Sequence, residues 1–216
     1  ITQLGTVHAF NGSTGQQVWS TTLNREPNTM FLLSTGLAIL DDVNSQGVIL
    51  LLDLLTGEQK HQIAPTCPNK IFSDDPQTLR ITSRNIWADP DLRNLYLAYG
   101  FFFSYCLEKW DTASGTRQWQ TEMPEDILRS DLLTAIDGGI LLLAPTMSGD
   151  LWAANPADGT ARQLLSQQDY YLRPLFTREG VVVVEAKRVK GSTRYEIWGL
   201  DSQSGKRLWQ VIPRAV

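Results

Sequence analysis

One pattern recurs five times along the 216-residue chain, and it constrains the fold more than any other feature. It first reads "HAFNGSTGQQVW" and returns as "LLDLLTGEQKHQ", "EKWDTASGTRQW", "WAANPADGTARQ" and "WGLDSQSGKRLW". The copies align on single glycines that follow one another at intervals of 42, 58, 44 and 46 residues. These are Gly15, Gly57, Gly115, Gly159 and Gly205. A period in the forties is typical of propeller blades or of helical arrays.

The segments between the glycines favour strands over helices. They are short apolar runs cut by turn residues, without a helical 3.6-residue period. Residues 166–211 show the unit best, with the runs "LRPLFT", "VVVVEAKRV", "RYEIWGLD" and "KRLWQV". Residues 128–165 and 30–63 repeat the same order. Four-stranded antiparallel meanders in tandem predict an all-β fold, the β-propeller.

The recurring pattern is predicted to be the hairpin between the third and fourth strands of each blade. An Asn or Asp four residues before the glycine can accept hydrogen bonds from backbone amides, and a Ser or Thr before the glycine adds a weaker one. Glycine supplies the positive φ that a bulged hairpin needs. The capping residues are Asn11, Asp53, Asp111, Asn155 and Asp201. Four residues after the glycine stand Trp19, His61, Trp119, Gln163 and Trp209, and we expect a Trp there to pack against the neighbouring blade.

Residues 1–216 are predicted to be a single β-propeller domain or part of one, with about four and a half repeats. Residues 1–23 form half a blade, and the full blades are 24–63, 64–121, 122–165 and 166–211. A propeller closes so that no edge strand stays open. Two strands of the first blade are missing, so either they lie in sequence absent here or the array is an open arc capped by a partner. We expect the first, because the chain starts at Ile1 as if within an element.

The third blade carries extra residues, and its stretch 64–94 is predicted to contain a surface loop insertion. Prolines and paired acids with few apolar residues are typical of such loops. The insertion either carries function or is a tolerated addition. Cys67 lies in it, and Cys106 lies near the start of the third strand of that blade. The two cysteines are either disulfide-bonded or two buried thiols.

Composition excludes two classes of partner. The formal net charge of −4 and the pI near 5.2 argue against nucleic acid, because no Lys/Arg cluster is present to neutralise phosphates. No apolar run reaches the roughly 18 residues of a membrane span, so the chain is predicted not to cross a membrane.

The recurring pattern resembles the repeat of the PQQ-like (quinoprotein-type) β-propeller family, which is close to A-x-D-x-x-x-T-G-x-x-x-W. The best matches are "AFNGSTGQQVW", "KWDTASGTRQW" and "GLDSQSGKRLW". The family includes quinone-dependent dehydrogenases and non-enzymatic scaffolds, among them the propeller lipoprotein of the bacterial outer-membrane assembly machine. A quinone enzyme would need a Ca²⁺ site of carboxylate and amide oxygens, an Asp base and aromatic stacking for the cofactor.

The residues that could carry chemistry are all interpreted as structural. We therefore predict no catalytic, cofactor-binding or metal-ligating residues and no cofactor. The paired turn acids are expected to be solvated or to cap backbone amides, the histidines to be partly buried and satisfied, and the serine to lack a His/Asp partner. Third-strand tryptophans are expected to pack between blades, which leaves Trp87 as the one that the repeat does not explain. These residues are Asp41, Asp42, Asp74, Asp75, Asp89, Asp91, His8, His61, Ser104, Trp110, Trp152 and Trp198.

The resemblance implies a non-enzymatic β-propeller scaffold that mediates protein–protein interaction, with a protein partner and an extracytoplasmic location, either periplasmic or at the cell surface. Two alternatives stay open. The first is a fragment of a PQQ- and calcium-dependent dehydrogenase whose site residues lie in missing blades. The second is a propeller that senses a ligand or glycan through its central funnel. The sequence leaves open the partner, the total blade number and the wider protein.

Overall fold

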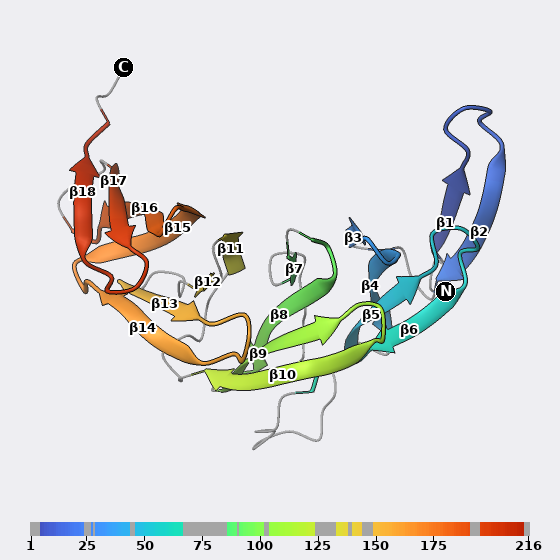
Figure 1. Cartoon of the computed structure of the whole chain (residues 1–216), viewed down its shortest axis with the longest axis horizontal. Coiled ribbons are helices and arrows are strands. Elements are labelled where there is room, and N and C mark those ends of the chain that lie inside the picture. The colour runs from blue at the N-terminus through green and yellow to red at the C-terminus, as the bar shows by residue number, and fades with distance from the viewer. Residues whose placement is uncertain are drawn as a thin grey trace. The chain divides into compact units, whose positions relative to one another are not determined.

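The computed structural model describes residues 5–23, 27, 29–43, 46–66, 86–89, 91–101, 104–123, 133–137, 140–143, 149–190 and 195–213. These residues form antiparallel strands and turns, without a helix (Figure 1). The chain divides into two compact units, residues 1–120 and 121–216, which are described separately. The predicted single domain over residues 1–216 and its blade bounds stay a prediction.

The first unit contains one two-stranded sheet and two four-stranded sheets, each joined in chain order. The predicted half blade is the pair β1 (Gly5–Phe10) and β2 (Gln17–Leu23). The next sheet contains β3 (Thr29–Leu32), β4 (Leu37–Val43), β5 (Gln46–Leu52) and β6 (Gln59–Ile63). The third contains β7 (Ile86–Ala88), β8 (Asn94–Phe101), β9 (Ser104–Asp111) and β10 (Thr116–Met123), whose last three residues belong to the second unit. The four-stranded meander that the repeat predicts is therefore confirmed in both complete sheets.

The second unit contains two further four-stranded meanders. One contains β11 (Leu133–Asp137), β12 (Ile140–Leu143), β13 (Asp150–Ala154) and β14 (Ala161–Ser166). The other contains β15 (Tyr170–Arg178), β16 (Val181–Arg188), β17 (Tyr195–Asp201) and β18 (Arg207–Val211). A core that includes Leu151, Val182 and Trp198 fills the space between these two sheets.

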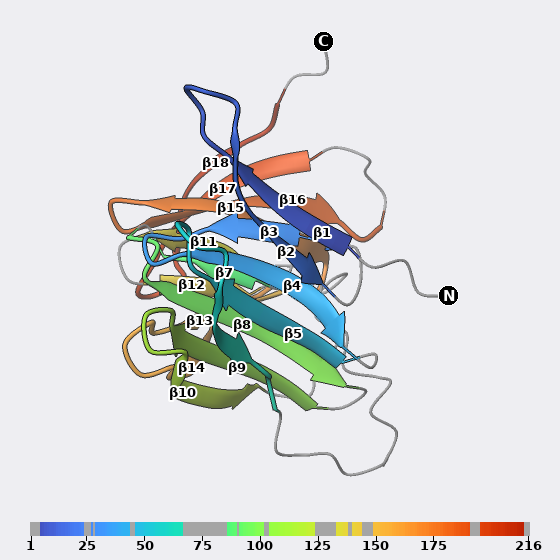
Figure 2. The ribbon, with the colours of Figure 1, turned by 90° about the vertical axis from the view of Figure 1, so that its right-hand side faces the viewer.

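The sheet β3–β6 is covered on both faces, which explains why β5 is apolar at successive positions. Side chains alternate between the faces of a strand. Leu50 and Leu52 pack with Val7 and Trp19 of the β1–β2 hairpin, which lies against this sheet (Figure 2). Leu51 packs in the opposite direction, in a core shared with β7–β9. A strand buried on both faces does not alternate between apolar and polar residues as a half-exposed strand does. The continuous apolar run of β5 therefore identifies a sheet that lies between two neighbouring sheets.

The predicted hairpins are confirmed at all five glycines. Each glycine has a φ between +66° and +76°. Its amide donates to the carbonyl four residues earlier, as from Gly57 N to Asp53 O at 2.9 Å. The register shifts beside these turns in β1–β2, β5–β6 and β17–β18, which is the expected bulge. Only a residue that tolerates positive φ can close this turn, so the glycine period in the sequence maps directly onto the fold.

The stretch 64–94 differs in part from the expected loop. Residues 67–85 lie outside the described residues, but Ile86–Ala88 form β7, the first strand of its sheet. Trp87 pairs with Tyr96 of β8 and is half-buried. A three-residue strand inside a polar, proline-containing stretch has too little apolar pattern to be recognised from sequence.

Candidate functional site

The hairpin turns are built by side chains that cap the backbone. Asp53 Oδ1 accepts hydrogen bonds from Leu55 N at 2.7 Å and from Thr56 N at 3.0 Å. The Thr56 hydroxyl oxygen accepts one from Glu58 N at 3.2 Å. Asn11 caps its own turn in the same way, through Ser13 N and Thr14 N. These contacts confirm the roles that the sequence predicts for the Asn/Asp and Thr positions.

The charge of Asp53 is stabilised in its turn. Lys60 Nζ lies 2.5 Å from Asp53 Oδ2. The hydrogen bond from Lys60, followed by those from the amides of Leu55 and Thr56, lowers the pKa of Asp53 to about 2. Hydrogen bonds from Ser114 likewise lower the pKa of Asp111. These carboxylates stay charged to low pH, so they act as fixed caps and not as proton donors near neutrality.

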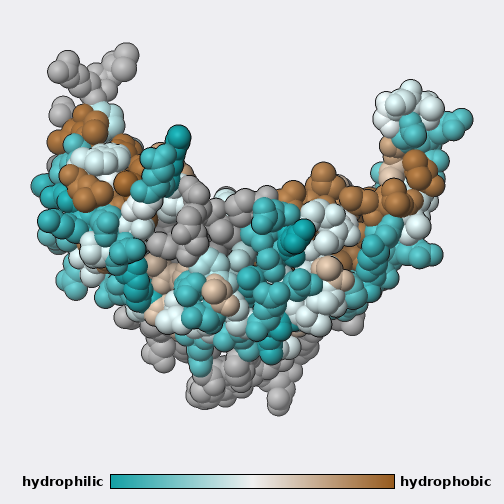
Figure 3. Space-filling view, viewed as in Figure 1, coloured by the Kyte–Doolittle hydropathy of each residue, from teal (hydrophilic) through white to brown (hydrophobic). Residues whose placement is uncertain are grey.

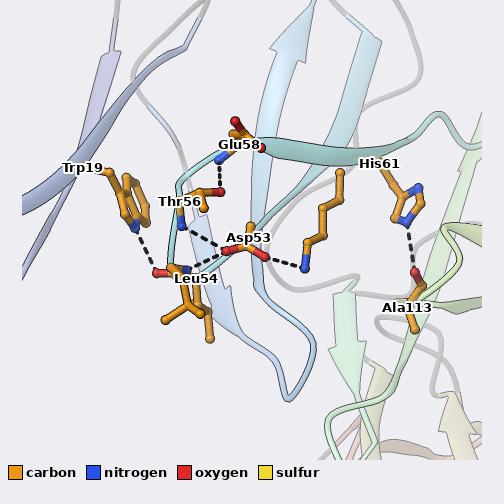
Figure 4. A network of polar contacts seen from close by, with 9 residues as sticks. Trp19, Asp53, Leu54, Thr56, Glu58, His61 and Ala113 are labelled. Atoms are coloured by element: carbon orange, nitrogen blue, oxygen red, sulfur yellow. Dashed lines mark hydrogen bonds and ion pairs between the residues drawn. The ribbon is translucent and has the colours of Figure 1, made fainter.

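The side chain four residues after the glycine reaches the next hairpin (Figure 4). Trp19 Nε1 donates to Leu54 O at 2.9 Å, and the indole lies over Gly57. A Cβ built on Gly57 would lie 2.5 Å from that ring, so no side chain fits there. The Thr21 hydroxyl adds a bond to Gly57 O at 2.6 Å. The turn glycine thus has two roles. It adopts the positive φ of the turn, and its lack of a side chain leaves room for the side chain of the preceding blade.

The same contact recurs with other side chains. His61 Nε2 lies 2.9 Å from Ala113 O, and its ring covers Gly115 (Figure 4).

In the second unit, the Thr121 hydroxyl donates to Gly159 O at 2.8 Å. Arg162 NH2 donates to Ser202 O at 2.8 Å, where Leu164 packs against Gly205. Within the first unit, and again between the last two sheets of the second, a hairpin therefore receives a side chain from the preceding fourth strand.

A second recurring network was missed by sequence reasoning. Glu108 is fully buried and bonds Trp110 Nε1 at 2.8 Å, Arg117 NH1 at 2.7 Å and Gln120 Nε2 at 3.0 Å. These three partners come from the third and fourth strands of the same sheet. Because these bonds are made inside the blade, Glu108 connects its two outer strands.

The last sheet repeats that network. Glu196 Oε2 accepts hydrogen bonds from Trp198 Nε1 at 2.9 Å and from Gln210 Nε2 at 2.8 Å. Arg207, at the position of Arg117, stacks over Trp198 with 4.8 Å between its guanidinium carbon and the ring centroid. The detectable signal was an acid two residues before the third-strand Trp and a Gln five residues after the turn glycine.

The two histidines lie in different environments. His8 is exposed and lies 3.2 Å from Gln17 Oε1, so the expectation that it is partly buried is wrong. His61 is half-buried and satisfied, as predicted. Ser104 lies in β9, and its side chain is outside the described residues.

The acids at the turns lie in different environments. Asp89 Oδ1 accepts hydrogen bonds from Arg93 N at 2.7 Å and from Asn94 N at 3.1 Å, which confirms the capping interpretation. Asp91 is exposed. Asp74 and Asp75, and the side chains of Asp41 and Asp42, lie outside the described residues. Within the part of the chain that the structure describes, no group of three or more His, Cys, Asp or Glu is placed to hold a metal ion.

The tryptophans are distributed as the repeat predicts, with one contrast. Trp110, Trp152 and Trp198 lie in the third strands β9, β13 and β17. Trp19 is 9% exposed, whereas Trp209, at the same repeat position, is 42% exposed. The ring of Trp209 is thus partly exposed to solvent, whereas the ring of Trp19 is packed.

The structure gives the bonding state of one of the two cysteines. Cys106 is fully buried in β9 and is disulfide-bonded. Cys67 lies outside the described residues. A cysteine sulfur in a disulfide is no longer a thiol and cannot act as a nucleophile or a metal ligand. Cys106 therefore has a structural role.

Among the described residues, there is no helix with the length and apolarity needed to span a bilayer.

Comparisons with known proteins agree on the repeat. A family model described as outer membrane protein assembly factor BamB matches residues 107–215. A search of curated proteins finds no significant match. Among solved structures, BamB from Moraxella catarrhalis is 18% identical with a TM-score of 0.53, over 96% of this chain and 58% of that protein.

Two other solved structures share the fold. The quinohemoprotein alcohol dehydrogenase ADHIIG from Pseudomonas putida HK5 is 12% identical, with a TM-score of 0.54 over 97% of this chain and 50% of that enzyme. The Dos1 propeller is 10% identical, with a TM-score of 0.58 over 98% of this chain and 54% of that protein. This chain therefore spans between half and three fifths of the length of these proteins.

The family model covers half of the chain, and its match begins in β9 and runs to the end of the last blade. Repeated four-stranded sheets, glycine hairpins and the structural matches all agree on a β-propeller of PQQ-like repeats. The chain belongs to the PQQ-like propeller family described as outer membrane protein assembly factor BamB.

Proposed function

We propose that the chain is a non-enzymatic β-propeller scaffold that mediates protein–protein interaction. One observation carries the proposal: β3 presents Met30 and Leu32 to solvent, 52% and 64% exposed, while Phe31 between them packs against the core. In Figure 3 hydrophobic residues gather over β3 and over β1–β2. Large apolar side chains grouped on one surface favour a protein partner.

The exposed side of β3 belongs to the face that the β1–β2 hairpin covers in part. Met30 pairs with Ile39 of β4, and paired residues of antiparallel strands point to the same face. Ile39 packs with Val7 and Trp19 of the hairpin. Met30 and Leu32 therefore lie on the part of that face that β1–β2 leaves open. We infer that the partner presents apolar side chains toward Met30 and Leu32, the two exposed apolar residues of β3.

The quinone-enzyme alternative finds less support in the described part of the chain. The fold is shared with a quinohemoprotein alcohol dehydrogenase, but a fold does not determine a function. Asp53 caps its hairpin and Glu108 bonds within its blade, and among the described residues no group of three or more His, Cys, Asp or Glu is placed to hold the Ca²⁺ of a quinone site.

We place the scaffold outside the cytoplasm. Disulfides persist in oxidising compartments, and Cys106 is disulfide-bonded. The family description, an outer membrane protein assembly factor, supports the same location.

The test is site-specific photo-crosslinking in the oxidising compartment of a bacterial host. A photoreactive phenylalanine replaces Met30 in one variant and Leu55 in the control. Leu55 is 80% exposed but lies on a hairpin turn away from β3. We expect a discrete adduct with another protein from position 30 and none from position 55. The same adducts from both positions, or none from position 30, contradict the proposal.

A second assay addresses the enzyme alternative. The purified chain is incubated with PQQ and Ca²⁺ and mixed with an artificial electron acceptor and primary alcohols. A scaffold gives no dye reduction above that of the acid-denatured chain. Turnover that requires both additions would replace the scaffold proposal with the dehydrogenase one.

A further inference from the structure

Two of the five hairpin turns are capped by asparagine, at Asn11 and Asn155, and three by aspartate. Both asparagines are exposed. In each turn the backbone amide two residues later donates to the asparagine Oδ1, at 2.9 Å in the first hairpin and at 3.0 Å in the fourth. The two turns differ at the next residue, because Gly12 follows Asn11 and Pro156 follows Asn155.

The sequence contains one Asn-Gly pair, Asn11–Gly12, and such a pair can react with itself. The nitrogen of the second residue can attack the asparagine Cγ, which closes a succinimide ring and releases the side-chain nitrogen as ammonia. Glycine favours this attack, because it has no Cβ to hinder the approach of its nitrogen. Pro156 prevents the same attack on Asn155, because the nitrogen of proline carries no hydrogen to lose.

The first turn holds hydrogen-bond donors at the atom where charge develops in this reaction. Attack on Cγ places negative charge on Asn11 Oδ1 before ammonia leaves. Ser13 N and Thr14 N already donate to this oxygen, at 2.9 and 3.0 Å. Fixed donors aimed at a developing oxyanion lower the barrier of such reactions. The backbone bonds that close the turn start from Asn11 N and Gly15 N, and among the described residues Gly12 N donates to no acceptor.

We propose that Asn11 is a site of spontaneous deamidation in the folded chain, through a succinimide formed with Gly12. Hydroxide takes the proton of the Gly12 amide, whose nitrogen bonds to Cγ. The Cγ–Nδ2 bond breaks, and ammonia leaves with a proton from water, which regenerates hydroxide. Water then opens the ring. Cleavage at Cγ gives aspartate, and cleavage at the main-chain carbonyl carbon gives isoaspartate. This inference does not rest on the proposed function, since it uses neither β3 nor a partner.

The two products affect the hairpin differently. Aspartate keeps the turn, because Asp53 accepts the same pair of amide bonds in the second hairpin. Its new charge has no equivalent of Lys60, the cation that pairs with Asp53, because Val18 stands at that position. Isoaspartate adds a methylene to the main chain and displaces the carbonyl that accepts the 2.8 Å bond from Gly15 N. This product therefore opens the turn between β1 and β2.

The first measurement is peptide mapping by mass spectrometry after incubation of the purified, folded chain at pH 7 and at pH 9. We expect the peptide that contains Asn11 to gain the mass of an amide-to-acid conversion, faster at pH 9 because hydroxide removes the amide proton. Isoaspartyl methyltransferase should label part of the product. The peptide that contains Asn155 should keep its amide at both pH values.

Exchanging the following residues provides the matched variants. Gly12→Pro gives the first turn the residue of the fourth, and Pro156→Gly does the reverse, so each turn receives a residue that the other already accommodates. We expect Gly12→Pro to abolish conversion at Asn11 and Pro156→Gly to start it at Asn155. Gly12→Leu, which copies the second hairpin, should slow conversion at Asn11 through its Cβ. Circular dichroism of each variant should match that of the unmodified chain.

Four outcomes overturn the proposal. The first is an Asn11 that keeps its amide at both pH values, or that loses it only after urea unfolding. The second is aspartate without isoaspartate, which would indicate direct hydrolysis without a ring. The third is equal conversion of Asn11 and Asn155 in the unmodified chain, and the fourth is conversion of Asn11 that continues unchanged in the folded Gly12→Pro or Gly12→Leu chain.

Discussion

At the residue scale, the hairpin caps separate the role of charge from that of geometry. The turns of Asn11 and Asp53 make the same pair of amide bonds, although one cap is neutral. The Asn/Asp choice therefore leaves the backbone unchanged and adds a charge that Lys60 can pair. This interchange was predictable from the sequence, because either side chain presents the oxygen that the turn requires.

Asp53→Asn should alter how stability depends on pH. The pKa of Asp53 is lowered to about 2 from its ordinary 3.8, so its charge stabilises the folded chain fully above 3.8. This contribution is lost as the pH falls through about 2, because the carboxylate is then protonated in both states. Urea unfolding at pH 7, 4, 3 and 2 should show the unmodified chain more stable at pH 7 and the difference shrinking below pH 4. A difference that is constant with pH would show that Lys60 does not stabilise the charge.

Glu108→Ala should destabilise the fold strongly. It leaves the Trp110 N–H and the Arg117 guanidinium without their buried acceptor. Breaking such a network costs about 3 kcal/mol, since Arg117 is partly exposed and can regain water. The matched control is Glu185→Ala, which removes the exposed pair with Arg173 and should cost less than about 1 kcal/mol. Equal losses in chemical denaturation would mean that burial of Glu108 does not matter.

At the element scale, the strands that could be predicted are those whose ends the turn chemistry marks. The glycine period located β9–β10 and β17–β18, because Asp and Gly have definite roles in their hairpins. β7 was missed because its three residues carry no period. The Glu108 network was also missed, because one acid near a Trp does not show that both point into the blade. The burial of a polar side chain depends on the neighbouring sheet, which local sequence does not contain.

The two equivalent tryptophans should differ in their contribution to stability. Trp19→Ala removes a ring that fills the space over Gly57 and a hydrogen bond to Leu54 O, and should cost about 3–5 kcal/mol. Trp209→Ala should cost about 1 kcal/mol, because that ring is 42% exposed. Denaturant unfolding of both variants measures the difference. Equal costs would show that contact with the next hairpin adds no stability.

At the scale of the whole molecule, the sheets within each of the two units pack on their neighbours along the chain. In such proteins stability is close to a sum of blade and interface contributions, so a local change need not spread. The chain also forms two compact units, with Cys106 in the first. Stability should therefore respond to the disulfide unevenly along the sequence.

Reduction should loosen the first unit and leave the second unchanged. A disulfide commonly contributes about 2–4 kcal/mol, and that of Cys106 is anchored in β9, beside the core strand β8. Hydrogen exchange with and without reductant should show faster exchange in β8 and β9 and no change in β16 and β17. Cys106→Ala should reproduce this pattern without reductant and should then be insensitive to it. If protection falls equally in both units, they unfold as one cooperative body, and the additive picture of the blades is wrong.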